Sequence, residues 1–397
     1  MTVSPIAWAD PARAGAFAGW LAAMARQHPM QADTVRLASA DASFRRYFRV
    51  DAAGGTNGEP GTGSYIIMDA PPAQEDCRPF VKVAGLMQDA GLNAPRVLAW
   101  DEPLGFMLLS DLGAQTLLDV IAPPSEVDAI AQPAAAHHDL YMDAVDALVR
   151  WQLASRPGVL PPYDEALLSR ELALFPDWYV ARHRGIALDA GLQGKLEGLF
   201  AQIKASNLQS LGGARVFVHR DFMPRNLMVA QFSDGPSLGK LAPSSGARGS
   251  ATPQAREATS VGATSIGVLD FQDAVYGPIT YDIASLMRDA FLSWEEEFVL
   301  DITVRYWQKA RKAGLPVGDD FGEFYRAVEW MGLQRHLKVL GIFARLTLRD
   351  GKPKYLLDTP RFIKYARNTA ARYRQLGPLM VLLDEIEGNE TRVGYTF

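Results

Sequence analysis

Cysteine is nearly absent from this sequence, which holds one, Cys77, among 397 residues. A single thiol cannot form a disulfide within the chain, so a disulfide-stabilised secreted scaffold is excluded and a reducing, cytoplasmic location is expected. No uninterrupted apolar run approaches 18 residues, so no membrane-spanning helix is expected. Residues 1–10 lack a basic start followed by an apolar segment, so we expect no secretory signal.

A strong excess of one charge is also missing. The chain has 40 basic and 45 acidic residues and a net charge of −5 at pH 7. This balance gives no reason to expect nucleic acid or an anionic membrane as a partner. The hydrophobic content of 48% is ordinary for a globular protein, and the length predicts two or three domains or lobes. The sequence leaves the oligomeric state open, and a monomer is compatible with it.

Strand patterns fill the first part of the chain, and helical patterns fill the rest. Five segments have the β-branched and aromatic composition of strands: 34–40, 44–50, 64–69, 97–100 and 106–109. A helical segment at 78–91 separates the third from the fourth, and apolar spacing near 3.6 residues dominates after residue 112. We predict an α+β fold with a small antiparallel-sheet lobe over 1–109 and a mainly helical lobe over 110–397.

Residues 232–264 break the helical pattern of the second lobe. They are crowded with Ser, Gly, Ala, Pro and Thr and show no apolar periodicity. Such a segment buries too little surface to offset the entropy lost on ordering. We predict a flexible insertion in a hairpin loop, and a regulatory role for it stays open.

Two short motifs carry the chemistry. Residues 219–226 read His-Arg-Asp-Phe-Met-Pro-Arg-Asn, with Asp and Asn at the spacing of a kinase catalytic loop. In such loops the Asp holds the acceptor hydroxyl, and the Asn helps to hold a metal ion. The predicted strand 266–270 then ends in a second Asp. We predict that Asp221 is the catalytic base and that Asn226 and Asp270 are oxygen ligands of Mg²⁺.

The segment after Asp270 departs from protein kinases. It reads Phe-Gln-Asp-Ala rather than Phe-Gly, and neither an Ala-Pro-Glu motif nor a peptide-presenting loop follows. The sequence resembles instead the aminoglycoside-phosphotransferase family of small-molecule kinases. Within it, the motif at 219–228 and Leu-Asp-Phe-Gln-Asp-Ala at 269–274 are most similar to the anomeric N-acetylmuramate/N-acetylglucosamine kinases of cell-wall recycling. Segments 43–48 and 333–338 add to this resemblance.

The resemblance implies a two-lobed, protein-kinase-like fold and an activity. The expected reaction is ATP-dependent phosphorylation of the anomeric hydroxyl of N-acetylmuramate and/or N-acetylglucosamine to the sugar 1-phosphate, in peptidoglycan recycling. It also implies that Asp282 braces the catalytic loop, and that the backbone of a hinge at Leu109 and Asp111 contacts the purine of ATP.

The phosphate side of the nucleotide site departs from the kinase pattern. Met68 stands on the strand where kinases place a Lys that binds the α- and β-phosphates. Arg45, Arg46 or Arg49 on the preceding strand is expected to substitute, with Arg46 slightly preferred. Because a strand alternates faces, Arg46 points opposite to the other two. The turn before this strand, which includes Ser43, is the predicted phosphate-covering turn.

The acceptor pocket is expected between Asp221 and the C-terminal helices. Arg225 lies inside the catalytic loop, where a cation can neutralise the transferred phosphate. Sugar rings stack on aromatic side chains, and a sugar acid needs a cation. Five residues of the helical region have this chemistry: Arg288, Trp294, Trp330, Arg335 and His336.

Two other functions stay open from the sequence. One is a kinase of another small alcohol, such as an aminoglycoside or choline; the glutamates at 295–297 would suit a cationic acceptor. The other is a nucleotide-binding regulator without catalysis, suggested by the missing Lys. Retention of both motifs opposes the second, because a protein without catalysis has no chemical need for them.

Overall fold

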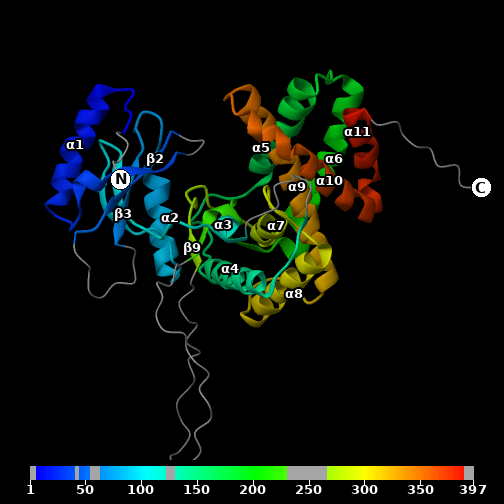
Figure 1. The fold of residues 1–397 in the computed structure, drawn as a ribbon. Coiled ribbons are helices and arrows are strands. Elements are labelled where there is room, and N and C mark those ends of the chain that lie inside the picture. The colour runs from blue at the N-terminus through cyan, green and yellow to red at the C-terminus, as the bar shows by residue number, and fades with distance from the viewer. Residues whose placement is uncertain (1–5, 41–43, 54–62, 122–129, 230–265, 389–397) are drawn as a thin grey trace, which may run out of the picture.

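The structure is a computed structural model, and it describes residues 6–40, 44–53, 63–121, 130–229 and 266–388 (Figure 1). A small sheet-based lobe is followed by a mainly helical region, which confirms the predicted kinase-like α+β fold. The lobe boundary after residue 109 stays a prediction. The predicted insertion and Ser43 lie outside the described residues.

The small lobe is built on a five-stranded antiparallel sheet with the strand order β1-β2-β3-β5-β4. Each predicted strand is present, with ends that differ by at most two residues from those expected. The strands are β1 (Arg36–Ala40), β2 (Arg46–Asp51), β3 (Ser64–Asp69), β4 (Val97–Asp101) and β5 (Phe106–Ser110).

One helix covers each face of this sheet. Helix α1 (Pro11–Ala25) packs Phe17 and Trp20 against Phe48 of β2 and against residues of β3 and β5 on the same face. Helix α2 (Arg78–Asp89) packs on the other face, against Met68 of β3 and residues of β5. In Figure 1, α2 lies between the sheet and the large lobe, so the α2 face of the sheet is directed toward the large lobe.

The large lobe is mainly helical. Its α-helices are α3 (Leu117–Ile121), α4 (Ala135–Leu153), α5 (Glu165–Leu174), α6 (Ala190–Gln209), α7 (Tyr281–Met287), α8 (Glu296–Lys312), α9 (Phe321–Leu348), α10 (Thr359–Arg372) and α11 (Gly377–Glu387). A π-helix, η2 (Phe175–His183), continues α5. Its short strands are β6 (Ile130–Ala131), β7 (Arg215–Val218), β8 (Leu227–Val229), β9 (Ile266–Val268), β10 (Val275–Pro278) and β11 (Ser293–Trp294).

Helix α9 runs through the middle of the large lobe and packs against α5, η2, α7 and α10. Nearly every residue of its central part is buried. Where it crosses the end of α5, an added Cβ on Gly341 would lie 2.2 Å from the backbone oxygen of Leu174, so only glycine fits this crossing. The helix is thereby held in close contact with the end of α5.

Candidate active site

The catalytic motif is held between two antiparallel strand pairs. β7 pairs with β10 and β8 pairs with β9, so residues 219–226 form a loop with both ends fixed. Asp221 is half-buried in this loop. Asn226 closes a 3-10 turn, η4 (Pro224–Asn226), and its amide nitrogen donates to the backbone oxygen of Asp221 at 2.9 Å. The two motif residues are therefore fixed relative to each other.

Two non-glycine residues beside the motif have left-handed backbones, Arg220 with φ of 78° and Asp270 with φ of 62°. Such a conformation costs about 1–3 kcal/mol and persists only where the surroundings enforce it. The carboxylate of Asp282 accepts hydrogen bonds from the backbone N–H of His219 at 2.7 Å and of Arg220 at 3.0 Å. Arg335 donates to the backbone oxygen of Arg220 at 2.6 Å. These contacts hold the strained loop from both sides.

Asp282 has no exposed surface. Burial raises the pKa of its carboxyl group, whereas the two backbone N–H groups favour the ionised form and lower this pKa. Burial is the larger effect, and the pKa is about 7. Both oxygens serve as acceptors, so the ionised form fits this geometry. The arrangement agrees with the bracing role that the resemblance implied.

His219 links the two motifs. Its Nε2 lies 2.9 Å from the backbone oxygen of Leu269, and its Nδ1 lies 3.2 Å from the backbone nitrogen of Asp221. Only the neutral ring with its hydrogen on Nε2 satisfies both contacts. Nε2 then donates to the oxygen of Leu269, and the unprotonated Nδ1 accepts from the backbone N–H of Asp221. Burial lowers the pKa of His219 to about 4, which keeps the ring neutral at pH 7.

A buried ionic cluster supports the loop from behind, and the sequence reasoning missed its centre, Glu171. Its carboxylate accepts from Arg220 Nη2 at 2.6 Å and Lys338 Nζ at 2.9 Å. It also accepts from Tyr163 Oη at 2.6 Å and Gln334 Nε2 at 2.9 Å. Burial raises the pKa of Glu171, but Lys338 and Arg220 outweigh it and bring the pKa to about 2. Glu171 is therefore ionised and joins α5 and α9 to the catalytic loop.

A signal for this buried charge was present in the sequence. Glu171 lies three residues after Leu168 and four before Phe175, which places it on the apolar face of its helix. A carboxylate on such a face needs cationic or hydrogen-bonding partners. The cationic partners come from residues far away in the sequence, so the position alone did not reveal them.

The predicted metal ligands lie together. Asn226 Nδ2 is 3.3 Å from Asp270 Oδ2, and Gln272 Nε2 donates to Asp270 Oδ1 at 2.8 Å. Both Asn226 and Asp270 line the interlobe cavity. The amide nitrogen of Asn226 is used within the protein, which leaves its oxygen for an ion. One carboxylate and one amide oxygen fit Mg²⁺, which usually keeps water and phosphate oxygens as its other ligands. Among the described residues, no group of three or more His, Cys, Asp and Glu offers an alternative metal cage.

A cavity of about 410 Å³ between the lobes joins these residues to the small lobe. Its size is that of a small-molecule site. The catalytic side contributes Arg225, Asn226 and Asp270. The predicted hinge residues Leu109 and Asp111 line another side. The structure thus brings the predicted metal and hinge residues to one cavity, and their roles stay predictions.

The three candidate arginines have different partners. Arg46 lies on the α1 face of the sheet, where it pairs with Asp69 at 2.6 Å and stacks over the ring of Trp8. This face is opposite to the cavity, so the placement disfavours the preferred candidate. Arg49 lines the cavity, but it pairs with Asp111 at 2.5 Å and donates to the backbone oxygen of Gly113 at 2.6 Å. The contacts of Arg49 therefore hold the predicted hinge segment in place.

Arg45 is the third candidate, and it is not among the residues that line the cavity. It shares the α2 face of the sheet with Tyr47. Tyr47 lines the cavity, and its side chain interacts with the guanidinium of Arg45. Its guanidinium pairs with Glu75 just before α2, with Nη2–Oε2 at 3.0 Å and Nε–Oε2 at 3.2 Å. Kinases place a Lys–Glu ion pair between their third strand and this helix. Arg45 stands two residues before Tyr47, which pairs with Met68 across the sheet, so the Arg45–Glu75 pair is a candidate substitute.

Three of the predicted acceptor residues are buried on α9. Trp330 and His336 are each 2% exposed, and Arg335 is 7% exposed. Arg335 contacts the catalytic loop, and His336 stacks on Tyr365 with ring centres 4.8 Å apart. The contacts of Arg335 and His336 indicate that these residues support the site.

The other two predicted acceptor residues, Arg288 and Trp294, line a second cavity of about 430 Å³, which we call the α10 pocket. It lies between the segment 288–296 and helix α10. Its charged residues are four basic and two acidic: Arg288, Arg361, Lys364, Arg372, Glu295 and Glu296. Basic residues thus predominate in this pocket, although the whole chain has a net charge of −5.

The fold and the paired motifs define a small-molecule phosphotransferase. The sequence pattern of the phosphotransferase enzyme family matches residues 34–239 and 261–320, and the chain belongs to this family. Among solved structures, the choline kinase of Cryptosporidium parvum is similar in fold. Its TM-score is 0.55, and it is 10% identical, with 92% of this chain and 99% of that chain covered.

Two relatives are much closer in sequence, and both are N-acetylmuramate/N-acetylglucosamine kinases. The protein of Pseudomonas aeruginosa is 46% identical over 87% of this chain and 86% of its own length. The protein of Neisseria meningitidis is 44% identical over 93% of this chain and 96% of its own length. Within the described residues, no helix is both long and apolar enough to cross a membrane.

Proposed function

We propose that this chain is an ATP-dependent kinase that phosphorylates the anomeric hydroxyl of N-acetylmuramate and N-acetylglucosamine. The observation that carries the proposal is the contact of Asn226 with both the backbone oxygen of Asp221 and the carboxylate of Asp270, in a chain 46% identical to an N-acetylmuramate/N-acetylglucosamine kinase. The need for ATP fits the cytoplasmic location expected from the single cysteine. A role in recovering cell-wall amino sugars follows from the same substrates.

Asp221 has the central role in the proposed reaction. Its carboxylate orients the sugar hydroxyl toward the γ-phosphorus and accepts the proton late. The hydroxyl oxygen bonds to this phosphorus while the bond to the β–γ bridging oxygen breaks, which gives ADP and the sugar 1-phosphate. Asn226 and Asp270 would hold Mg²⁺, which neutralises charge on the phosphates when bound. Arg225 lines the same cavity and adds positive charge on the acceptor side.

The small lobe positions the nucleotide in this proposal. The backbone at Leu109 and Asp111 receives the purine, and the contacts of Arg49 keep that hinge in place. Arg45, held by Glu75, faces the α- and β-phosphates. A guanidinium suits this task because its N–H groups match a pair of phosphate oxygens.

The α10 pocket argues against the alternative of a cationic acceptor. Choline and aminoglycosides carry positive charge, and a pocket rich in Arg and Lys repels it. The glutamate run that kept this alternative open is partly used within the protein, because Glu296 pairs with Arg288 at 2.8 Å.

Product analysis tests the proposal. The purified protein is incubated with ATP, Mg²⁺ and, separately, N-acetylmuramate, N-acetylglucosamine, choline and an aminoglycoside, and ³¹P NMR identifies the products. We expect a sugar phosphate whose phosphorus couples to the anomeric proton. A 6-phosphate would refute the anomeric assignment. Phosphocholine or a phosphorylated aminoglycoside alone would refute the sugar, and ATP left unchanged throughout would support the regulator.

A further inference from the structure

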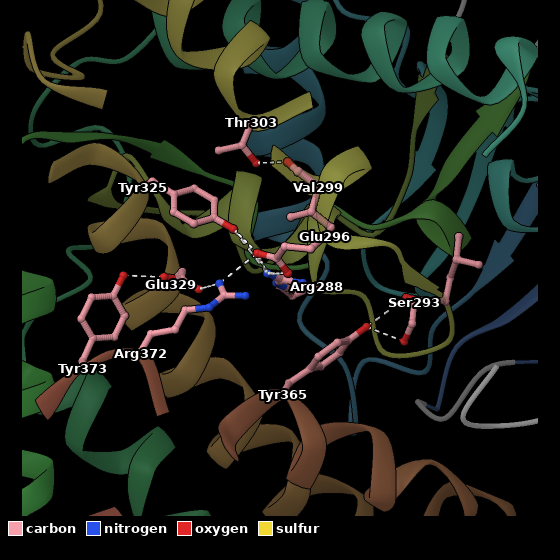
Figure 2. Close-up of polar contacts among 11 residues, drawn as sticks. Arg288, Ser293, Glu296, Val299, Thr303, Tyr325, Glu329, Tyr365, Arg372 and Tyr373 are labelled. Carbon is pink, nitrogen blue, oxygen red and sulfur yellow. Dashed lines mark hydrogen bonds and ion pairs between the residues drawn. The ribbon is translucent and has the colours of Figure 1, made fainter. Parts of the chain in front are cut away.

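The α10 pocket contains a cation that the protein does not neutralise closely. Two of its arginines have short carboxylate partners, as Figure 2 shows for Arg288 and Arg372 with Glu296. Arg372 also pairs with Glu329, and Tyr325 donates to Glu296 at 2.5 Å. These two guanidinium groups are therefore satisfied by the walls of the pocket.

Arg361 is different. It is 5% exposed, and its Nη1 donates to the neutral hydroxyl of Ser293 at 2.5 Å. The carboxylate that pairs with it, Asp358, lies 3.8 Å from its Nη2. Its Nε has no hydrogen-bond partner among the described residues. The buried carboxylate of Asp289 also interacts electrostatically with Arg361, but among the described residues it forms no hydrogen bond or ion pair with it. A buried guanidinium whose nearest paired carboxylate lies at 3.8 Å and whose Nε is unused favours an anionic ligand.

The chemistry around Arg361 fits a carboxylate on a sugar. Ser293 also exchanges a hydrogen bond with Tyr365 at 2.6 Å, as Figure 2 shows. The guanidinium of Arg361 is thus linked through Ser293 to a second hydroxyl group. Trp294 supplies an aromatic wall, and the exposed Lys364 adds a second cation at the rim. Guanidinium binds a carboxylate through two parallel N–H groups, and the flat aromatic surface suits a sugar ring.

The pocket is structurally continuous with the catalytic loop. Arg225 of the loop lies 5.0 Å above the ring of Phe291, two residues before the pocket residue Ser293. Asp282, which holds the loop, is the second residue of helix α7. Arg288 follows six residues later, about 9 Å along a helix. The same segment thus connects the reacting centre to the basic pocket.

We propose that the α10 pocket is a carboxylate-recognition subsite in which Arg361 binds the lactyl carboxylate of N-acetylmuramate. The inference rests on the proposed function. N-Acetylglucosamine lacks this carboxylate, so the pocket favours the sugar acid over the neutral sugar. Arg361 is in this view a specificity-determining residue, and the neutral sugar still reaches Asp221 without it.

The test compares kcat/KM for the two sugars in the Arg361→Gln and Arg361→Lys variants. The ratio of N-acetylmuramate to N-acetylglucosamine should fall about 10- to 100-fold in Arg361→Gln, the range expected for loss of a hydrogen-bonded charge pair. Arg361→Lys should recover part of the loss, because it keeps the charge without the paired donors. Arg367→Gln is the matched control: it makes the same change on the same helix, outside this pocket, and should leave the ratio unchanged.

A ligand change tests the same idea without altering the protein. The methyl ester of N-acetylmuramate removes the charge, and its KM with the unmodified enzyme should rise by a similar factor. This measurement decides the matter if the Arg361 variants fail to fold. An unchanged ratio in a folded Arg361→Gln variant, or an ester that binds as well as the acid, would overturn the subsite. Failure of the unmodified enzyme to phosphorylate either sugar would instead overturn the proposed function.

Discussion

Replacing Glu171 by Gln should destabilise the protein more than any other conservative change of a carboxylate partner described above. The substitution keeps the shape of the side chain and removes its charge. Arg220 and Lys338, whose side chains are 19% and 9% exposed, then lose their shared counter-ion. Breaking a buried ion pair from one side typically costs about 3–5 kcal/mol.

The pKa of Glu171 gives an independent magnitude. Its fall from 4.5 to about 2 corresponds to roughly 3 kcal/mol of stabilisation. Because the folded-state pKa is the lower one, this contribution is complete above pH 4.5 and disappears as the pH falls toward 2. At about 2–4 °C per kcal/mol for a unit of 150–250 residues, Tm at pH 7 should fall by about 6–20 °C.

The assay is thermal unfolding followed by circular dichroism between pH 3 and pH 7. Glu385→Gln is the control, because Glu385 also accepts from a lysine, Lys195, but in an exposed pair that contributes at most about 1 kcal/mol. The double variant Glu171→Gln with Lys338→Met should regain part of the stability, since it removes one of the two unpaired cations. The difference in Tm between the unmodified protein and Glu171→Gln should narrow as the pH falls. A loss in Glu171→Gln no larger than that in Glu385→Gln would refute the reasoning.

Five further substitutions test the proposed roles. Asp221→Ala and Asp270→Ala should each lower kcat by about 10²–10⁴-fold with Tm nearly unchanged, and retention of a tenth of kcat by either would contradict its role. Asp282→Asn should lower kcat with little effect on the KM for ATP. The new Asn places an NH₂ group against one of the two backbone N–H groups that Asp282 accepts from, and this repulsion displaces the loop. A kcat equal to that of the unmodified enzyme would argue against the bracing role of Asp282. Arg45→Ala should raise the KM for ATP without changing that for the sugar, while Arg46→Ala should lower Tm and leave both KM values alone; the reverse pattern would assign the phosphates to Arg46.

The parts of the site that are local in sequence were the most predictable. Asp221 and Asn226 lie in one loop, and Asp270 follows its own strand, so motif spacing alone brought them together. The strand alternation that separates Arg46 from Arg45 was also correct. Which face meets the nucleotide depends on where α1 and α2 pack, and a strand pattern does not contain that information.

The buried residues of α9 were harder to assign from sequence. When a helix is surrounded on all sides, its pattern has no polar face to distinguish a supporting residue from a ligand-binding one. Arg335 and His336 therefore looked available for a substrate, although Arg335 contacts the loop backbone and His336 is enclosed by aromatic rings. Glu171 shows the same limit, because its partners are 49 and 167 residues away.

Catalytic support and the α10 pocket are carried largely by different parts of the chain. Glu171 of α5 and Lys338 of α9 hold the loop, whereas Arg361 and Lys364 belong to α10. If Arg361 selects the acceptor as proposed, substitutions in α10 change the preferred acceptor without touching the residues that hold the catalytic loop. This division gives a physical route by which one ancestral scaffold diversifies its substrates, since new specificity needs no new chemistry.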